Sequence, residues 1–465
     1  MTMISRLPAK QLIVAMVMCL ALLLIATQPA SMTPNQTHVL GIILVTLALW
    51  ATSVVPSYLA SLIFFTITLI FGLAAPDLVF SGFTSAAIWL IVSGFVIGSA
   101  IGNSGLGNRL AAVLDPMLTS SYTRLIGGLM LAAMLLGFLM PSSIGRAVVL
   151  VPIGMALADR IGFALGSNGR AGIAVVLTIA CNMPSFAILP SNIPNMVLVG
   201  ASETIHGVHF GYMDYLALHY PVLGILKAII TVMLVVRLFP ATIDPVAKTA
   251  ASGADTGTTS AAQFRVAIIL LITLAFWMTD SVHGINAAWI GLATACILLL
   301  PGIGIVSPAN FKTSVDFGML LFVVGALAVG TLVNATGLGS LLGSAMTRIL
   351  QLSHGADMLN FLSLSLMTTI IGVFATMPGV PAVLTPMAPD LAAQTGFDLQ
   401  AVLMTQVVGF STIIFPYQVA PLIVAMQLAG ERLGNLVRVI MPLAAVTILV
   451  LLPLDYFWWK FLGWI

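Results

Sequence analysis

Charged side chains are scarce in this chain. Lys, Arg, Asp and Glu make up only 6% of the 465 residues, whereas hydrophobic residues make up 60%. A water-soluble domain needs roughly 25–35% charged residues on its surface, so this composition excludes a soluble fold. The net charge of +2 is too small for a nucleic-acid partner, because such proteins present strongly basic surfaces. The composition therefore predicts a polytopic membrane protein surrounded by lipid.

Cysteine and catalytic motifs are scarce as well. Cys19, Cys181 and Cys296 lie within apolar stretches, which predicts buried thiols and no disulfide framework. No HExxH or GxSxG motif occurs, and no His or Asp pair stands out inside the apolar stretches. A membrane-embedded enzyme needs such groups, so the sequence gives this class of protein less support. No cofactor is expected. Four histidines are assigned to the surface: His206, His209, His219 and His283.

Apolar stretches of roughly 17–25 residues can cross a bilayer as helices. Two longer apolar stretches, 125–160 and 359–393, break in the middle at polar, Pro-containing tips. We predict re-entrant hairpins there, because a tip at membrane depth must be buried in protein; Pro-kinked crossing helices are the alternative. The remaining stretches predict an all-α protein with eleven transmembrane helices, near 11–29, 37–55, 57–75, 85–102, 171–202, 215–239, 264–281, 284–301, 315–335, 399–430 and 436–461.

The basic residues predict the orientation. With the N-terminus inside and both hairpins entering and leaving on one side, most of the 16 Lys and Arg residues fall on the cytoplasmic side. This places a multi-pass protein in a bacterial inner membrane with a cytoplasmic N-terminus. The first stretch, 11–29, is long enough to be a retained helix rather than a cleaved signal peptide.

Short motifs recur in the same order in the two halves of the chain. The pairs are Gly98, Gly105 and Gly107 with Gly330, Gly337 and Gly339, Met140-Pro141 with Met377-Pro378, and Ser185 and Pro190 with Ser411 and Pro416. An odd number of crossings separates the copies, which predicts an inverted repeat. The predicted units are N-terminal membrane helices at 1–56, a first repeat at 57–239, a flexible cytoplasmic linker at 240–263 and a second repeat at 264–465.

One apolar stretch in each half is interrupted by prolines and polar residues. The interruptions predict unwound backbone at 189–194 and 416–420, next to hairpin tips at 141–145 and 378–381. Prolines remove backbone donors, and polar residues do not face lipid without a reason. Paired interruptions of this kind point to the binding site of a secondary transporter, and alternating access fits them better than a channel does.

Arg146 is the most suggestive single residue, because it follows the first tip inside an apolar stretch. A guanidinium can grip a carboxylate, sulfate or sulfonate through paired donors, and it can also replace the charge of a sodium ion. The alternative is a side chain that snorkels to the cytoplasmic side. Lys227 lies in the middle of 215–239 without polar neighbours in the sequence, which favours a structural or snorkelling role.

The order of elements over about 57–455 resembles the divalent anion:sodium symporters. The motifs that carry the resemblance are Val151-Pro152-Ile153, Leu189-Pro190 with Pro194-Asn195, the tip at 378–381, Thr385-Pro386-Met387, and Phe415-Pro416 with Pro421. The resemblance implies a homodimer with a scaffold domain and a moving transport domain. It also implies elevator-type transport of a di- or tricarboxylate, sulfate or sulfonate, as a symporter or an exchanger. Arsenite, gluconate and citrate permeases and cation/proton antiporters of the wider ion-transporter superfamily are the alternatives.

The family carries Ser-Asn-Thr at both hairpin tips, where substrate and sodium are held. Here the matching residues are Ser142-Ser143-Ile144 and Gly379-Val380-Pro381, so at most one sodium ion is predicted, with proton coupling or anion exchange in its place. The predicted substrate-binding residues are Ser142, Ser143, Arg146, Ser191, Asn192, Asn195, Gly379, Val380, Pro416, Tyr417 and Gln418. The predicted cation-binding residues, for Na+ or H+, are Ser142, Ser143, Pro190, Gly379 and Pro416. Asn195 can also cap the helix after Pro194.

Overall fold

The computed structural model describes residues 9–106, 121–140, 142–243, 260–374 and 377–465. Every regular element within these ranges is helical. The predicted class, an all-α polytopic membrane protein, is therefore confirmed. The predicted linker at 240–263 falls mostly on residues 244–259, which lie outside the described ranges.

Ten helical segments of the described chain are long and apolar enough to cross a membrane. Seven are single helices: α1 (Ala9–Thr27), α2 (Pro34–Thr52), α5 (Ala86–Ser104), α7 (Tyr122–Leu139), α14 (Ala261–Met278), α18 (Phe317–Ala335) and α20 (Asp357–Phe374). Three are composite: α9 (Asn168–Ala180) with the turn after it, α11 (Tyr212–His219) with α12 (Lys227–Leu238), and α25 (Leu433–Val446) with α26 (Leu452–Phe461). The last two pairs are joined by π-helical segments, Tyr220–Leu226 and Thr447–Leu451.

Three predicted crossings form shorter helices than their apolar stretches suggest. They are α3 (Ser57–Ile70), α16 (Ala287–Leu299) and α23 (Leu399–Phe410), with 14, 13 and 12 residues. α16 ends because Pro301 disfavours a helical conformation at the residue before it, and Leu300 is extended. The remaining helices are α4 (Pro76–Val79), α8 (Ser143–Arg160), α10 (Ile193–His206), α15 (Asp280–His283), α17 (Pro308–Ser314), α19 (Leu338–Leu350), α21 (Val380–Leu384), α22 (Ala388–Thr395) and α24 (Ala420–Leu428).

Polar side chains fix where most long helices begin. Ser85, Ser121 and Ser167 precede α5, α7 and α9, and each accepts a hydrogen bond from a backbone N–H of the first turn. By contrast, neither α10, which begins inside the protein, nor α24, whose first residue Ala420 is exposed, has a side-chain cap. Pro194 and Pro421 have no N–H, and the N–H of Leu422 donates to the carbonyl oxygen of Val419 at 3.1 Å. The amides that remain available to another acceptor are therefore those of Ile193, Asn195 and Ala420.

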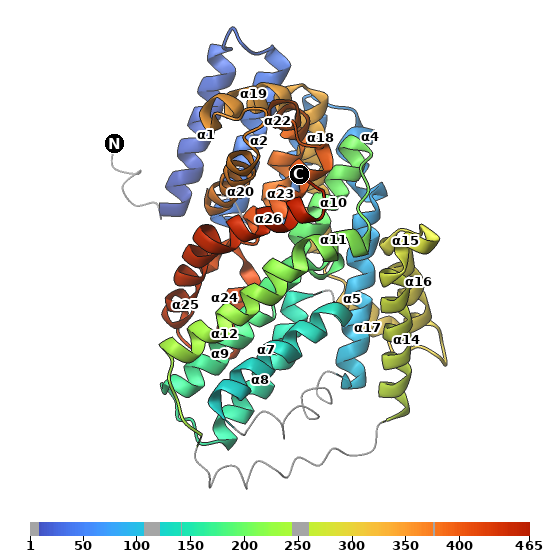
Figure 1. The fold of residues 1–465 in the computed structure, drawn as a ribbon. Helices are drawn as coiled ribbons and strands as arrows, with labels where there is room; N and C mark the ends of the chain where they lie inside the picture. The colour runs from blue at the N-terminus through green and yellow to red at the C-terminus, as the bar shows by residue number, and fades with distance from the viewer. Residues whose placement is uncertain (1–8, 107–120, 141, 244–259, 375–376) are drawn as a thin grey trace, which may run out of the picture.

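The second half of the chain repeats the order of elements of the first (Figure 1). α5, the α7–α8 hairpin, the broken helix α9–α10 and the π-containing helix α11–α12 come first. α18, the α20–α22 hairpin, the broken helix α23–α24 and the π-containing helix α25–α26 follow. The matched glycines Gly105 and Gly337 both take left-handed φ angles, of 69° and 73°. The order agrees with a duplication, while the unit boundaries stay a prediction.

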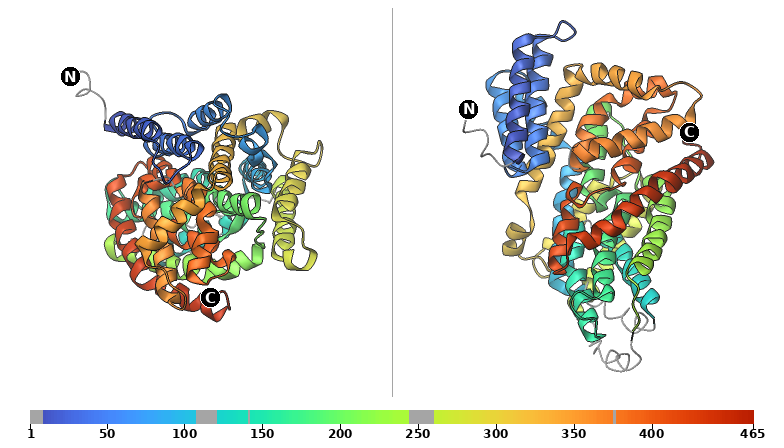
Figure 2. Two further views of the ribbon diagram at one scale, coloured as in Figure 1. Left: turned by 90° about the horizontal axis from the view of Figure 1, so that it is seen from above. Right: turned by 90° about the vertical axis from the view of Figure 1, so that its left-hand side faces the viewer.

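The half-helices after the two breaks pack across the boundary between the halves. α10 packs against α18 and α21, whereas α24 packs against α8 and α9. Figure 2 shows α1, α2 and the α14–α16 pair at the edges of the molecule, away from these crossing half-helices. The breaks therefore lie where elements of both halves meet.

The outer surface is apolar, as expected for a chain in lipid. α14 exposes Phe264, Leu271 and Phe276 on its outer side. The prediction of three buried thiols is wrong for Cys19 and Cys296, which are exposed, and right for the buried Cys181. A residue inside a span can face either lipid or protein, and composition alone does not distinguish the two.

Close packing of α20 on α23 depends on Gly409. A methyl group there would overlap Thr368 and approach the carbonyl oxygen of Ser365 to 2.5 Å. We expect Gly409→Ala to destabilise the purified protein by about 1–3 kcal/mol, because overpacking forces backbone shifts. Thermal unfolding in detergent measures this. Gly102→Ala is the matched control, since nothing lies within 4 Å of its added methyl group. Equal melting temperatures for the two variants would contradict the predicted close approach.

Candidate functional site

The first broken helix is interrupted over a longer segment than predicted. α9 ends at Ala180, two 3-10 turns follow at Met183–Ala187 and Leu189–Ser191, and α10 begins at Ile193. Pro184 and Pro190 stand at the start of the two turns, where a missing N–H does least harm. The predicted unwound backbone is thus confirmed at 189–192, whereas residues 193 and 194 already belong to α10, and the interruption begins at Cys181.

The first hairpin tip is tighter than predicted. α7 ends at Leu139 and α8 begins at Ser143, so residues 143–145 of the predicted tip are helical. The Oγ of Ser142 caps α8 by accepting a hydrogen bond from the N–H of Gly145 at 3.1 Å. Pro141 lies outside the described residues.

Arg146 is fully buried and donates all of its guanidinium hydrogens to protein oxygens. Its Nε and Nη2 lie 3.0 Å and 2.8 Å from the carbonyl oxygen of Cys181. Its Nη1 donates to the Oγ of Ser191 at 2.8 Å and to the carbonyl oxygen of Met140. Its Nη2 also reaches the Oγ of Ser143 at 3.1 Å and the carbonyl oxygen of Ser191 at 3.4 Å. The snorkelling alternative is therefore wrong for Arg146.

These contacts connect the hairpin tip to both sides of the break. Cys181 caps the C-terminus of α9, where the carbonyl oxygens carry the negative end of the helix dipole. The five acceptors of Arg146 are all oxygens, which is the ligand type that a hard cation prefers. The guanidinium thus occupies a cage of oxygen atoms built from three segments of the chain.

Three further predicted residues gather around Ser185 in the first break. Asn192 Nδ2 donates to the Oγ of Ser185 at 3.1 Å, and the Oγ of Ser143 lies 3.4 Å from the same atom. Asn195 Nδ2 lies within 3.2 Å of three carbonyl oxygens of the break, those of Ser185, Phe186 and Ile188. Asn195 thus ties the unwound backbone together, while its Oδ1 is buried without a hydrogen-bond partner.

Sequence reasoning missed Asn182. It directly follows the end of α9 and is 1% exposed, yet neither its Oδ1 nor its Nδ2 has a hydrogen-bond partner. A buried amide without partners is costly, so such a group usually faces a ligand or water that satisfies it. Its position inside the apolar stretch 171–202 was the available signal, because Asn is unfavourable inside an apolar span.

The second break is held by Gln418. α23 ends at Phe410, a 3-10 turn covers Pro416–Gln418, and α24 begins at Ala420. The Oε1 of Gln418 accepts from the N–H groups of residues 414 and 415 at 2.8 Å and 2.7 Å, and its Nε2 donates to the carbonyl oxygen of Gly372 at 2.8 Å. Tyr417 is 53% exposed and donates to the carbonyl oxygen of Val373 at 2.9 Å. Both side chains therefore connect the break to the hairpin arm α20.

The second hairpin tip presents mainly backbone. Gly379 and Val380 are buried there, at the end of a 3-10 turn and the start of α21. Behind them, Gln406 of α23 approaches the Oγ1 of Thr385 at 3.5 Å, while its Oε1 has no partner. His206 of α10 contacts the carbonyl oxygen of Thr385 at 2.8 Å, so this histidine is half-buried between the two halves.

Lys227 and His219 are both buried. Lys227 is 3% exposed, and its Nζ donates to the carbonyl oxygen of Ser411 at 2.7 Å, so of its two predicted roles the structural one is right and snorkelling is wrong. His219, assigned to the surface, is fully buried against Trp459. The π-helical segment Tyr220–Leu226 continues the helix between His219 and Lys227, and both side chains lie inside the helical bundle.

At each break, a basic side chain therefore donates a hydrogen bond to the carbonyl oxygen at the C-cap of the half-helix that ends there. Arg146 binds the C-cap residue of α9, and Lys227 binds the C-cap residue Ser411 of α23. Arg146 belongs to α8 of the adjacent hairpin, whereas Lys227 belongs to α12, which follows a π-helical segment. Both breaks thus have a positive charge beside the negative end of a helix dipole.

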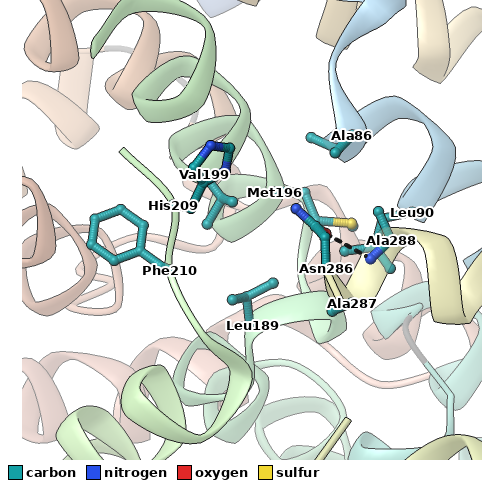
Figure 3. Close-up of a pocket in the computed structure, with 11 residues that line it drawn as sticks. Ala86, Leu90, Leu189, Met196, Val199, His209, Phe210, Asn286, Ala287 and Ala288 are labelled. Carbon is teal, nitrogen blue, oxygen red and sulfur yellow. Dashed lines mark hydrogen bonds between the residues drawn. The ribbon is translucent and has the colours of Figure 1, made fainter. Parts of the chain in front are cut away.

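A small cavity borders the first break. It holds about 20 Å³ and is lined by Leu189, Met196 and Val199, with Leu90 of α5 and Asn286 before α16 on its far side (Figure 3). This volume is about that of one water molecule, so the cavity is too small for an organic anion. The side chain of Asn286 accepts a hydrogen bond from the N–H of residue 288 at 2.9 Å and is a helix cap.

The fold and the paired breaks define the class of polytopic membrane transporters. A family model described as "Sodium:sulfate symporter transmembrane region" matches residues 8–465, and the chain belongs to this family. The resemblance predicted from the motifs is confirmed. Members of this family are transporters, so the class of membrane-embedded enzymes is set aside.

Several relatives are 22–26% identical to this chain. A Cupriavidus necator membrane protein is 26% identical over 97% of this chain and 92% of its own length. The chloroplastic dicarboxylate transporter 2.2 of Arabidopsis thaliana is 25% identical over 83% of this chain and 72% of its own. The L-tartrate/succinate antiporter of Shigella dysenteriae is 23% identical over 73% and 72%. The solved YdaH transporter of Alcanivorax borkumensis, at 18% identity, has a TM-score of 0.55 over 98% of this chain and 99% of its own, which supports the fold alone.

The oxygen cage predicts a large stability effect at Arg146. Arg146→Ala leaves several buried acceptors without donors, and we expect it to lose at least about 3 kcal/mol of stability, measured by thermal unfolding in detergent. Arg146→Lys keeps the charge but has three donors instead of five, so an intermediate loss is expected. Arg348→Ala on the exposed side of α19 is the control. A stable alanine variant would show that the cage does not depend on the guanidinium.

Proposed function

We propose that this chain is a secondary active transporter of a small dicarboxylate, with elevator-type alternating access. The observation that carries the proposal is the oxygen cage around Arg146. Positions where the family holds substrate and sodium are here tied together by a guanidinium that the chain itself supplies. Two relatives named for dicarboxylate and for tartrate/succinate transport support the substrate class.

Arg146 acts as a tethered cation in this proposal. Its contacts leave no N–H free for an anion, so it contributes long-range charge, or direct bonds only after part of the cage opens. A sodium ion placed about 4 Å from the guanidinium would be repelled by about 4 kcal/mol at an effective dielectric constant of 20. That is comparable to the whole binding energy of a millimolar ion. The first half therefore needs no coupling sodium, and at most one sodium binds in the second.

The anion binds between the open amides of the two half-helices after the breaks. α10 and α24 begin without side-chain caps, and helix N-termini favour anions. α24 packs against α8, which carries Arg146, and α10 packs against α21 at the second tip. The unpartnered amide of Asn182 supplies a further donor. The proposed contacts are Ser142, Ser143, Ser191, Asn192, Asn195, Gly379, Val380, Pro416, Tyr417 and Gln418, with Arg146 beside them.

The moving domain consists of the hairpins and broken helices in this proposal, and α1, α2 and their neighbours form a scaffold in a homodimer. Figure 2 supports this division, because α1 and α2 stand apart from the elements that carry the breaks. Of the predicted cation ligands, Gly379 and Pro416 of the second half hold the one remaining ion, whereas Arg146 supplies the charge at Ser142, Ser143 and Pro190 of the first half. The protein lies in a bacterial inner membrane with its N-terminus in the cytoplasm, as the basic residues predict.

Uptake of radiolabelled succinate into proteoliposomes tests this function. With unlabelled succinate inside, uptake is expected to persist when choline replaces sodium at fixed pH, because Arg146 supplies a permanent charge. Arg146→Lys should be at least about tenfold slower, a loss of about 1.4 kcal/mol, since the cage loses two donors. Arg348→Ala should match the wild type. Steep, sigmoidal sodium dependence would contradict the tethered cation, and absence of uptake for succinate, tartrate and sulfate would contradict the substrate class.

A further inference from the structure

A second group of buried titratable side chains lies outside the proposed anion site. Lys227, Asp455 and His219 are 3%, 0% and 0% exposed. Lys227 opens α12 and Asp455 lies in the first turn of α26, so each follows the π-helical segment of its own half. The two π-containing helices run next to each other (Figure 1). The group therefore brings together matching positions of the two halves.

Asp455 is the unusual member of this group. Both of its carboxylate oxygens are buried, and neither has a hydrogen-bond partner of normal geometry in the described part of the chain; the indole of Trp459 is the one side-chain donor that acts on them. Its charge acts on that of Lys227, whose Nζ is held 2.7 Å from the carbonyl oxygen of Ser411. An ionised carboxylate with so little hydrogen bonding is far more costly in an apolar interior than a protonated one. The geometry favours a carboxyl group that takes up a proton and releases it again.

The neighbours of Asp455 link it to His219. Trp459, one turn further along α26, has a buried Nε1 without a partner, and its ring centroid lies 5.7 Å from that of His219. The Nδ1 of His219 is also unpartnered, while its Nε2 contacts the sulfur of Met404 at 3.4 Å. His219 is therefore the one competing proton acceptor in this group that has a free ring nitrogen among the described residues.

Other titratable groups lie on the packed elements. The charged ones pair as Arg170 with Asp159 and Glu431, Arg438 over the ring of Phe239, and Lys460 over the ring of Tyr456. The tyrosine Tyr215 contacts the ring of His219 and donates to the carbonyl oxygen of Phe186 at 2.9 Å. Asp214 and Asp357 lie in the first turns of α11 and α20, and Tyr122 lies at the start of α7. Among these side chains, Lys227 is the charge that acts on Asp455.

We propose that Asp455 is a proton-binding site that couples anion transport to proton movement through Lys227. With Asp455 ionised, its negative charge offsets the ammonium beside the second break. When Asp455 takes up one proton from water and becomes a neutral carboxyl, the ammonium of Lys227 is no longer offset. The C-terminal end of α23 then carries a net positive charge next to the anion site.

The direction of coupling follows from this charge balance. A free positive charge favours an anion, so proton binding and anion binding strengthen each other by the same factor. One proton enters with each anion, and anion affinity rises as pH falls. This coupling rests on the proposed function, although the proton site itself does not. Arg146 differs, because a guanidinium keeps its proton whereas carboxyl and amine groups exchange theirs.

Infrared difference spectra of the purified protein test the proton site without any substrate. A stretching band of a buried protonated carboxyl is expected to appear as the pH is lowered and to be missing from Asp455→Asn. The exposed control Asp77→Asn should keep the band. A band that persists in Asp455→Asn, or disappears in His219→Gln instead, would overturn the assignment.

Transport separates the coupling from the proposed function. In proteoliposomes with labelled succinate, an inward proton gradient should accelerate wild-type uptake, while Asp455→Asn should lose this acceleration and keep succinate exchange. If the wild type shows no succinate transport but the infrared band depends on Asp455, the proposed function fails and the proton site stands. A gradient effect of equal size in wild type and Asp455→Asn would overturn the coupling.

A double variant covers the case in which Asp455→Asn does not fold. Lys227→Met with Asp455→Leu replaces both charges with apolar side chains, which often leaves a protein as stable as before. The carboxyl band should be missing from this variant too. Its melting temperature should also lose the pH dependence that we expect for the wild type. A retained band in the folded double variant would rule out Asp455 as its source.

Discussion

A helix that breaks inside a membrane leaves carbonyl and amide groups that water cannot reach, and this constraint governs the centre of the molecule. Each break is closed by polar side chains that hydrogen-bond to its free backbone groups. Arg146 and Asn195 hold the first break, and Gln418 and Lys227 hold the second. The hairpins, the π-containing helices and the crossing half-helices all position one of these groups. The donors that stabilise the breaks are thus also the groups that give the site its charge.

The two halves reach the same result with different residues. In the first half, Arg146 and the serines that it contacts, Ser143 and Ser191, belong to the same half of the chain as the break that they stabilise. In the second half, Gly379 and Val380 form the tip, and the basic side chain is Lys227, which belongs to α12 of the first half. Duplication explains the common order of elements, while the separate origin of the cations shows that the two sites have diverged.

The sequence predicted the breaks and tips because their signal is local. Proline lacks an N–H wherever it stands, so Pro190 and Pro416 mark interrupted helices without any knowledge of the fold. The roles of His219 and Lys227 were not predictable in this way, because their partners Trp459 and Ser411 lie about half a chain away. The helix that carries both residues continues through a π-helical segment instead of ending in a loop, and the hydrophobic periodicity of the sequence does not indicate such a segment. Asn182 was within reach of sequence reasoning, since a polar residue in an apolar span needs an explanation.

The burial of Arg146 has an electrical consequence. An ion that couples transport can leave its carrier after each crossing, but a guanidinium bonded into the moving domain cannot. Every return of an empty elevator domain would then carry a positive charge through the membrane field, at about 2.3 kcal/mol for each 100 mV crossed. A bound dianion reverses the sign of the travelling charge. The membrane voltage would therefore act on the loaded and the empty carrier in opposite directions, and a carrier that returns loaded avoids the slower of the two steps.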